Sequence, residues 1–202
     1  MPSQWRAKAT SPGHCAGRSL ETLRHDPPMR RWGLIASGIA TLLLLWAMSP
    51  MEDRMQANGP GMVPFELSGG EARADEILSE WGDDGRDAAR EQLWIDYGFM
   101  LAYGTFLGLA AAAIRDLCRR RDLQRLARIG AKAIWLGPLA AAFDALENAC
   151  LLLTVGGSGA PFPTLATTFA AVKFALLAAA IVYLLAAAAG LASRAARPPQ
   201  PG

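Results

Sequence analysis

Histidine and cysteine are scarce in this chain, and their positions exclude several kinds of site. The two histidines, His14 and His25, lie in a polar leader. The apolar body therefore has no imidazole for zinc, haem or copper, and none for His-dependent catalysis. The three cysteines, Cys15, Cys118 and Cys150, are far apart and form no CxxC motif, which argues against a disulfide framework or a thiolate metal site. We expect no cofactor and no metal.

An excess of charge of one sign is also lacking. The chain has 20 Lys and Arg against 18 Asp and Glu, a formal net charge of +2. Its basic residues flank apolar blocks instead of forming a patch with interleaved aromatic residues, so we expect no nucleic-acid partner.

Apolar residues, in contrast, are abundant and are gathered into blocks of helix length. Hydrophobic residues make up 52% of the 202 residues and charged residues 19%. Such blocks are typical of helices that cross a bilayer. We predict an all-α, polytopic membrane protein with four transmembrane helices and one or two short helices in an acidic extracytoplasmic segment between spans 1 and 2. Its first partners are then membrane lipids.

The predicted boundaries follow the changes in composition. They are a disordered leader at 1–28, span 1 at 29–49, the acidic segment at 50–91, span 2 at 92–115, a basic cytoplasmic loop at 116–128, span 3 at 129–155, an outer turn at 156–161, span 4 at 162–193 and a disordered tail at 194–202. Gly137-Pro138 predicts a kink in span 3, because proline removes a backbone donor.

The start of the chain leaves two questions open. Met29 begins a basic flank that leads straight into an apolar run, so it is a candidate initiator. That run is either a retained anchor or a cleaved signal peptide. It is longer than a usual signal-peptide core, and the small-residue pattern at its end is followed at once by Pro50, which favours the anchor.

The acidic segment contains the pattern of a short helix. Ser68 and Glu71 have the spacing of a capping box, and Gly82 is placed to end the helix after Trp81. One apolar stripe lies between them, formed by Ala74, Ile77, Leu78 and Trp81. We expect this stripe to cover either the membrane surface or the ends of the membrane helices.

Orientation follows from the distribution of Lys and Arg. The leader, the loop at 116–128 with its flanks and the tail hold 15 of the 20, whereas the acidic segment holds four. The positive-inside rule therefore places both termini in the cytoplasm. The alanine- and arginine-rich composition is typical of bacteria of high genomic GC content, and we expect the bacterial inner membrane.

Four ionisable residues lie within or beside the apolar blocks: Asp96, Asp144, Glu147 and Lys173. A charge at membrane depth is costly and requires a partner or a function. Measured by helix rise from the cytoplasmic arginines, Asp96 and Lys173 lie about 28 and 31 Å up their helices. All four residues are thereby placed in the outer half of the bilayer, where they can form one cluster.

The spacing of Asp144, Glu147 and Asn148 puts all three on one helical face. We expect this face to point into the bundle, where Lys173 pairs with a carboxylate and Asn148, Tyr97 and Tyr103 donate hydrogen bonds. The candidate site, a ligand-binding or intramembrane polar cluster, is thus Asp96, Tyr103, Asp144, Glu147, Asn148 and Lys173. In an alternative interpretation, Lys173 reaches up to the interface, Asp96 is a solvated cap, and the other acids only hold helices together.

Several of these residues also support a resemblance. Phe65-Glu66-Leu67, Trp81, Asp96 followed by Tyr103, a basic loop and Asp144-x-x-Glu147-Asn148 resemble a group of small bacterial four-helix membrane proteins of unassigned function. The resemblance covers residues 62 to 190. It implies an inner-membrane protein with the acidic segment outside, and it implies no activity.

Four functions are compatible with these features. The first is a non-enzymatic protein whose outer-leaflet polar cluster binds a small or lipid-like ligand. The second is a membrane-embedded enzyme that uses Asp144 or Glu147 as general acid or base on a lipid. The third is a small proton-coupled carrier, and the fourth a structural or assembly partner in a membrane complex. We favour the first, because no nucleophile or cofactor motif supports an enzyme.

Overall fold

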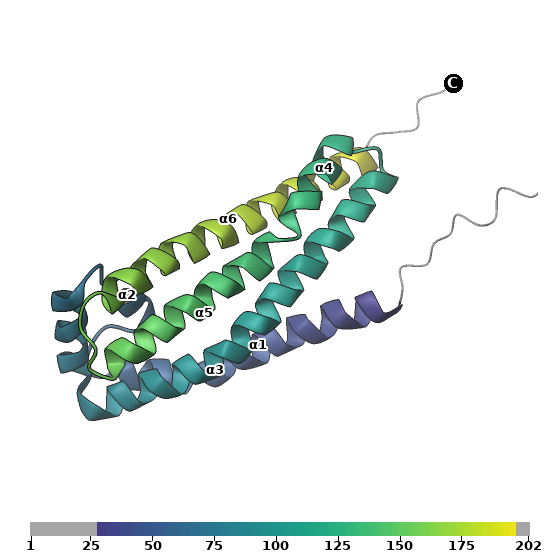
Figure 1. Ribbon diagram of the computed structural model, residues 1–202. Coiled ribbons are helices and arrows are strands. Elements are labelled where there is room, and N and C mark those ends of the chain that lie inside the picture. Colours follow the sequence, from purple (N-terminus) through teal and green to yellow (C-terminus); the bar gives the residue numbers. More distant parts are fainter. Residues whose placement is uncertain (1–27, 197–202) are drawn as a thin grey trace, which may run out of the picture.

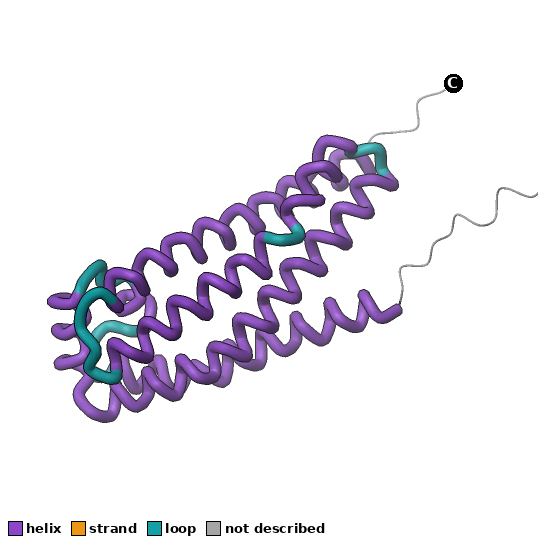
Figure 2. Tube along the Cα trace, in the orientation of Figure 1, coloured by secondary structure: helices purple, strands orange, loops and turns teal. Residues whose placement is uncertain are grey.

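The computed structural model describes residues 28–196, and every regular element in this range is a helix. The helices are α1 (Pro28–Gln56), α2 (Met62–Glu66), α3 (Glu71–Arg120), α4 (Gln124–Ala133), α5 (Leu136–Val155) and α6 (Phe162–Ala195). The long helices run side by side in an elongated bundle (Figure 1), with short connections between them (Figure 2). The expected disorder of the leader and tail falls almost wholly on residues 1–27 and 197–202, outside the described range.

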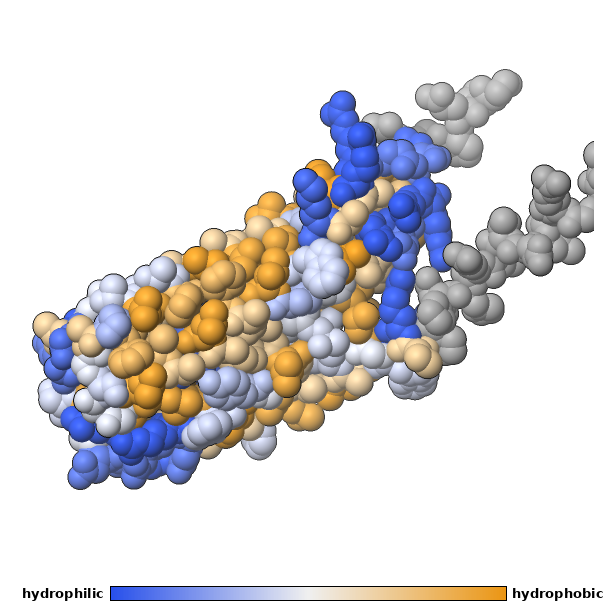
Figure 3. Space-filling view, in the orientation of Figure 1, coloured by the Kyte–Doolittle hydropathy of each residue, from blue (hydrophilic) through white to orange (hydrophobic). Residues whose placement is uncertain are grey.

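Four stretches of helix are long and apolar enough to cross a membrane: Met29–Gln56, Glu71–Arg120, Gln124–Val155 and Phe162–Ala195. On the face shown in Figure 3, hydrophobic residues form a belt between two hydrophilic ends. The predicted all-α architecture with four spans is therefore confirmed, and the chain has the composition of a multi-pass membrane protein.

Two predicted boundaries change. The first helix continues through Pro50 to Gln56, because its last turns pack on α3: Met55 is fully buried, and Arg54 pairs with Asp84 at 2.6 Å. The predicted loop at 116–128 is wrong for most of its length. α3 extends to Arg120 and α4 begins at Gln124, so only residues 121–123 connect them. Arginine is a good helix former, and a dense basic run does not by itself end a helix.

The segment before span 2 forms a cap over one end of the bundle. We use "cap" for α2 together with residues 71–81 of α3. The helix begins at Glu71 as predicted, and Gly82 breaks it with a φ of +60°, a conformation that glycine adopts without strain. The capping box is wrong, since the residue before the helix is Gly70 and no side chain caps it.

The apolar stripe of the cap covers the ends of the membrane helices. Its four residues are buried in one hydrophobic cluster with Phe65 of α2, Leu151 and Val155 of α5 and Ala166 of α6. Of the two expected roles, covering the helix ends is the one observed. This packing holds α2 across the bundle at the level of the predicted polar residues.

The third span is interrupted near Pro138. α4 ends at Ala133 and α5 begins at Leu136 (Figure 2), so Pro138 lies in the first turn of α5, where its missing N–H leaves no helical bond unmade. Beyond the break, α5 lies very close to α3. A Cβ on Gly137 would be 2.7 Å from the Leu107 Cβ and 2.8 Å from the Gly104 carbonyl oxygen.

Candidate functional site

The site begins with the polar face of α5. Asp144, Glu147 and Asn148 are 3%, 0% and 1% exposed, and they point into the bundle because their spacing of three and four residues places them on one helical face. The predicted inward orientation of this face is therefore observed.

Lys173 on α6 supplies the cation at the centre of the site. Its Nζ lies 2.8 Å from Glu147 Oε2, 3.1 Å from Asp144 Oδ1 and 3.2 Å from Glu66 Oε2. The residue is 6% exposed. The alternative in which Lys173 reaches up to the interface is therefore wrong, since the ammonium is enclosed by three carboxylates.

Two further residues of the predicted cluster lie on α3. The Tyr103 hydroxyl donates to Asp144 Oδ2 at 2.8 Å, which the close approach of α3 and α5 allows. Asp96 is half-buried and accepts a hydrogen bond of 2.7 Å from Asn148 Nδ2. The six predicted residues therefore gather in one region as two bonded groups, Lys173 with Asp144, Glu147 and Tyr103 in one and Asn148 with Asp96 in the other, and we call the two groups together the network.

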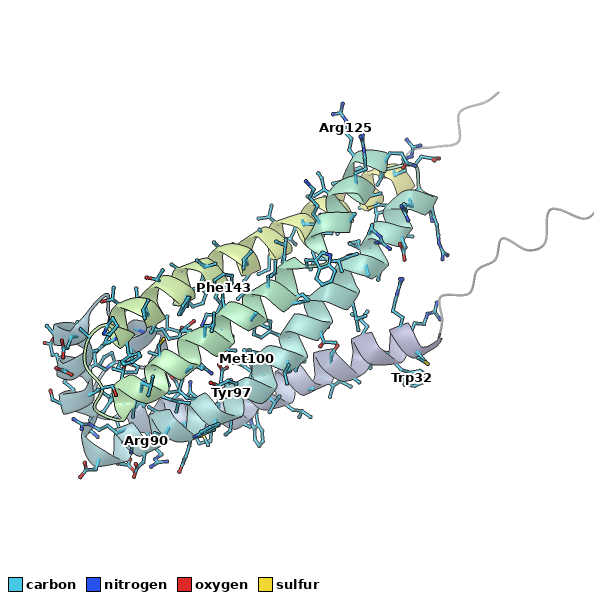
Figure 4. All side chains as sticks on the ribbon, in the orientation of Figure 1. Trp32, Arg90, Tyr97, Met100, Arg125 and Phe143 are labelled. Carbon is cyan, nitrogen blue, oxygen red and sulfur yellow. The ribbon has the colours of Figure 1, made fainter. Side chains whose placement is uncertain are left out.

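Tyr97 does not join this network, contrary to expectation. It lies on the central part of α3 (Figure 4), is half-buried, and its ring lies 5.7 Å from that of Trp94. No described residue is hydrogen-bonded to its hydroxyl. The donors in the site are instead Tyr103, Asn148 and Lys173.

Glu66 was missed as a site residue. It is the last residue of α2, and its carboxylate reaches Lys173 from the cap. Burial raises the pKa of the Glu66 carboxyl above its ordinary value, against the opposing pull of the Lys173 ammonium. The sequence contains one signal, the motif Phe65-Glu66-Leu67 of the resemblance, but a five-residue helix is too short for periodicity to show which way Glu66 points.

A cavity of about 670 Å³ adjoins the network. It opens between α1 and the rest of the bundle, where α1 packs mainly against α3. Its lining changes along its length. One end is lined by polar residues of the cap, the network and the end of α1, and the walls by large apolar residues, among them Leu45, Phe99, Phe106, Phe174 and Leu177.

A Tyr103→Phe substitution tests the network directly. It removes the hydroxyl donor and leaves a buried carboxylate oxygen of Asp144 without that partner. The ring still packs on Phe99, whose centroid is 5.3 Å away. We expect a loss of about 1.5–3 kcal/mol in the free energy of unfolding, the usual value for a hydrogen bond to a charged group, measured by denaturant titration of the purified protein.

Tyr97→Phe is the matched control for this substitution, because it removes the same kind of atom six residues away on the same helix. We expect it to change stability by less than about 0.5 kcal/mol. Equal effects of the two substitutions would show that the Tyr103–Asp144 hydrogen bond does not stabilise the bundle.

Comparisons with protein-family models, with curated proteins and with solved structures found no match to this chain. Function must therefore be inferred from the residues and geometry of the site.

Proposed function

We propose that this chain is a non-enzymatic protein of the bacterial inner membrane that binds a small or lipid-like amphiphile in the cavity beside Lys173. The observation that carries the proposal is the composition of the cavity, with carboxylates at one end and apolar walls along the rest. An amphiphile has the same division between head and tail.

The size and position of the cavity support a ligand of this kind. Its volume of about 670 Å³ lies within the range of pockets that hold small molecules, roughly 300–1,000 Å³. Its apolar walls lie in the belt that faces lipid, so a ligand can enter sideways between α1 and α6. In the orientation favoured by the positive-inside rule, with both termini in the cytoplasm, the cap lies on the extracytoplasmic side and the polar end of the cavity lies in the outer leaflet.

The proposal is tested by mass spectrometry of the lipids and small molecules retained by gently purified protein. We expect the parent to retain a species that an Asp144→Asn, Glu147→Gln double variant loses. An Asp75→Asn, Glu80→Gln variant makes the same change of charge at two exposed positions of the cap and should retain it. Circular dichroism and thermal unfolding establish that each variant is folded.

A second variant separates binding from the integrity of the ion pairs. Leu177→Trp places a larger side chain on the apolar wall of the cavity and leaves every residue of the network unchanged. The proposal requires this variant also to lose the retained species. If parent and variants retain the same background lipids, the carboxylates only hold helices together, and the search turns to a protein partner.

A further inference from the structure

The polar end of the cavity is rich in carboxylates. Five carboxylates line it, against one cation, Lys173. They are Glu52, Asp53, Glu66, Asp96 and Asp144. The three N–H donors of an ammonium are matched at Lys173 by three carboxylates within 3.2 Å. The Lys173 ammonium is thus already enclosed by carboxylates, and these would repel an anionic head group.

Three buried acceptor atoms in this region have no hydrogen-bond donor among the described residues. One is Oε1 of Gln92, a residue that lines the cavity, and the other two are the carboxylate oxygens of Glu147, which pairs with Lys173. A buried acceptor without a hydrogen bond is costly, by roughly 1–3 kcal/mol. A ligand that brought N–H donors to the polar end would relieve at least the cost at Gln92.

A metal ion is a poorer candidate than an organic cation. Within residues 28–196, no group of three or more His, Cys, Asp or Glu side chains is arranged to hold a metal. The carboxylates instead surround Lys173 or lie apart along the cavity. A bare ion would also leave the space between the apolar walls unfilled.

From these observations we infer that the amphiphile carries a primary ammonium group, which binds beside Gln92, Asp53 and Asp96, while its hydrocarbon chain lies along Phe106 and Leu177. This inference depends on the proposed function, since it names the ligand class of the same cavity. The ammonium can belong to a single-chain amine or to the head group of an aminophospholipid, and both present the same N–H donors.

The test compares three probes of equal chain length, dodecylamine, dodecanol and dodecanoate, by their dissociation constants for the full-length protein in a neutral detergent. We expect dodecylamine to bind at least about tenfold more tightly than dodecanol, a difference of about 1.4 kcal/mol, and dodecanoate to bind most weakly. An Asp53→Asn, Asp96→Asn variant should lose most of this preference, because it removes two charges from the cavity and leaves the three ion pairs of Lys173 intact.

An Asp75→Asn, Asp83→Asn variant, with the same change of charge at exposed positions in and beside the cap, should keep the preference for dodecylamine. If all three probes bind the parent equally and Leu177→Trp blocks them, the amphiphile cavity stands and the ammonium inference is overturned. If none binds and no species is retained, the proposed function fails as well.

Competition in lipid nanodiscs identifies the source of the ammonium. Phosphatidylethanolamine offers N–H donors and phosphatidylcholine does not, although their charges are the same. Displacement of dodecylamine by the first lipid alone assigns an aminophospholipid, and displacement by neither assigns a single-chain amine. Equal displacement by both would contradict the requirement for N–H donors.

Discussion

Replacing Lys173 with methionine will destabilise the folded bundle by about 3–5 kcal/mol, the usual cost of removing one partner of a buried ion pair. Methionine fills much of the space of lysine but leaves Glu66, Asp144 and Glu147, which are within 3.2 Å of the ammonium, without their cation. The loss is measured by denaturant titration or by the rate of proteolysis. The control is Lys132→Met, an exposed lysine of α4, which should change stability by less than about 0.5 kcal/mol.

The cause of this loss is tested by removing the stranded charges. Adding Asp144→Asn and Glu147→Gln to the Lys173→Met variant should restore much of the lost stability, because a neutral polar pair costs less to bury than unpaired carboxylates. A triple variant no more stable than Lys173→Met would show that the lysine acts through packing and not through its charge.

The stability that the Lys173→Met variant loses should depend on pH in a defined direction. Burial raises the pKa of Glu66 in the folded state, so the folded chain releases this proton at a higher pH than the unfolded chain, in which a glutamate has a pKa of about 4.3. Stability from this group is therefore present at low pH and lost as the pH rises through the folded-state pKa. Lys173→Met removes the opposing pull of the ammonium. The loss in its free energy of unfolding, relative to the parent, should therefore be larger at about pH 8 than at about pH 5.

Much of the site could be predicted from the sequence because charge is costly in an apolar block. Asp144, Glu147 and Asn148 stand out at helical spacing among alanines and leucines, and such residues must point into the bundle. The same reasoning selects Lys173, which forms ion pairs with Asp144 and Glu147. The number of spans could be predicted as well, since apolar runs of this length match the thickness of a bilayer.

The remainder depends on tertiary geometry that no local pattern encodes. Glu66 reaches Lys173 because hydrogen bonds hold the turn after α2 to α6. The Gly69 N–H donates to Thr167 Oγ1 at 2.9 Å, and that hydroxyl donates to the Glu66 carbonyl oxygen. The cavity exists because α1 packs on α3 and leaves a space beside α6. Neither the packing of α2 on α6 nor that of α1 on α3 has a sequence signal, since each joins segments far apart in the chain.

Trp81→Ala will loosen the cap and cost about 3–5 kcal/mol, as truncation of a buried tryptophan does elsewhere. Trp81 is 1% exposed, its indole N–H donates to the Pro60 carbonyl oxygen at 2.5 Å, and its ring lies 4.9 Å from that of Phe65. Phe65 precedes Glu66 on α2, so the indole holds in place the element that carries the third carboxylate of the Lys173 cluster. The substitution should therefore also increase cleavage by protease between residues 57 and 70.

Trp94→Ala is the matched control, since Trp94 lies on the same helix but is 67% exposed. It should neither expose the cap to protease nor lower stability by more than about 0.5 kcal/mol.

A comparison with Glu66→Gln then separates two roles of the cap. If the cap serves only to hold Glu66 in place, Glu66→Gln and Trp81→Ala will lower ligand retention equally. If it also encloses the polar end of the cavity, Trp81→Ala will lower retention further. The opened cap then admits water to the carboxylates, and water weakens their interaction with the ligand.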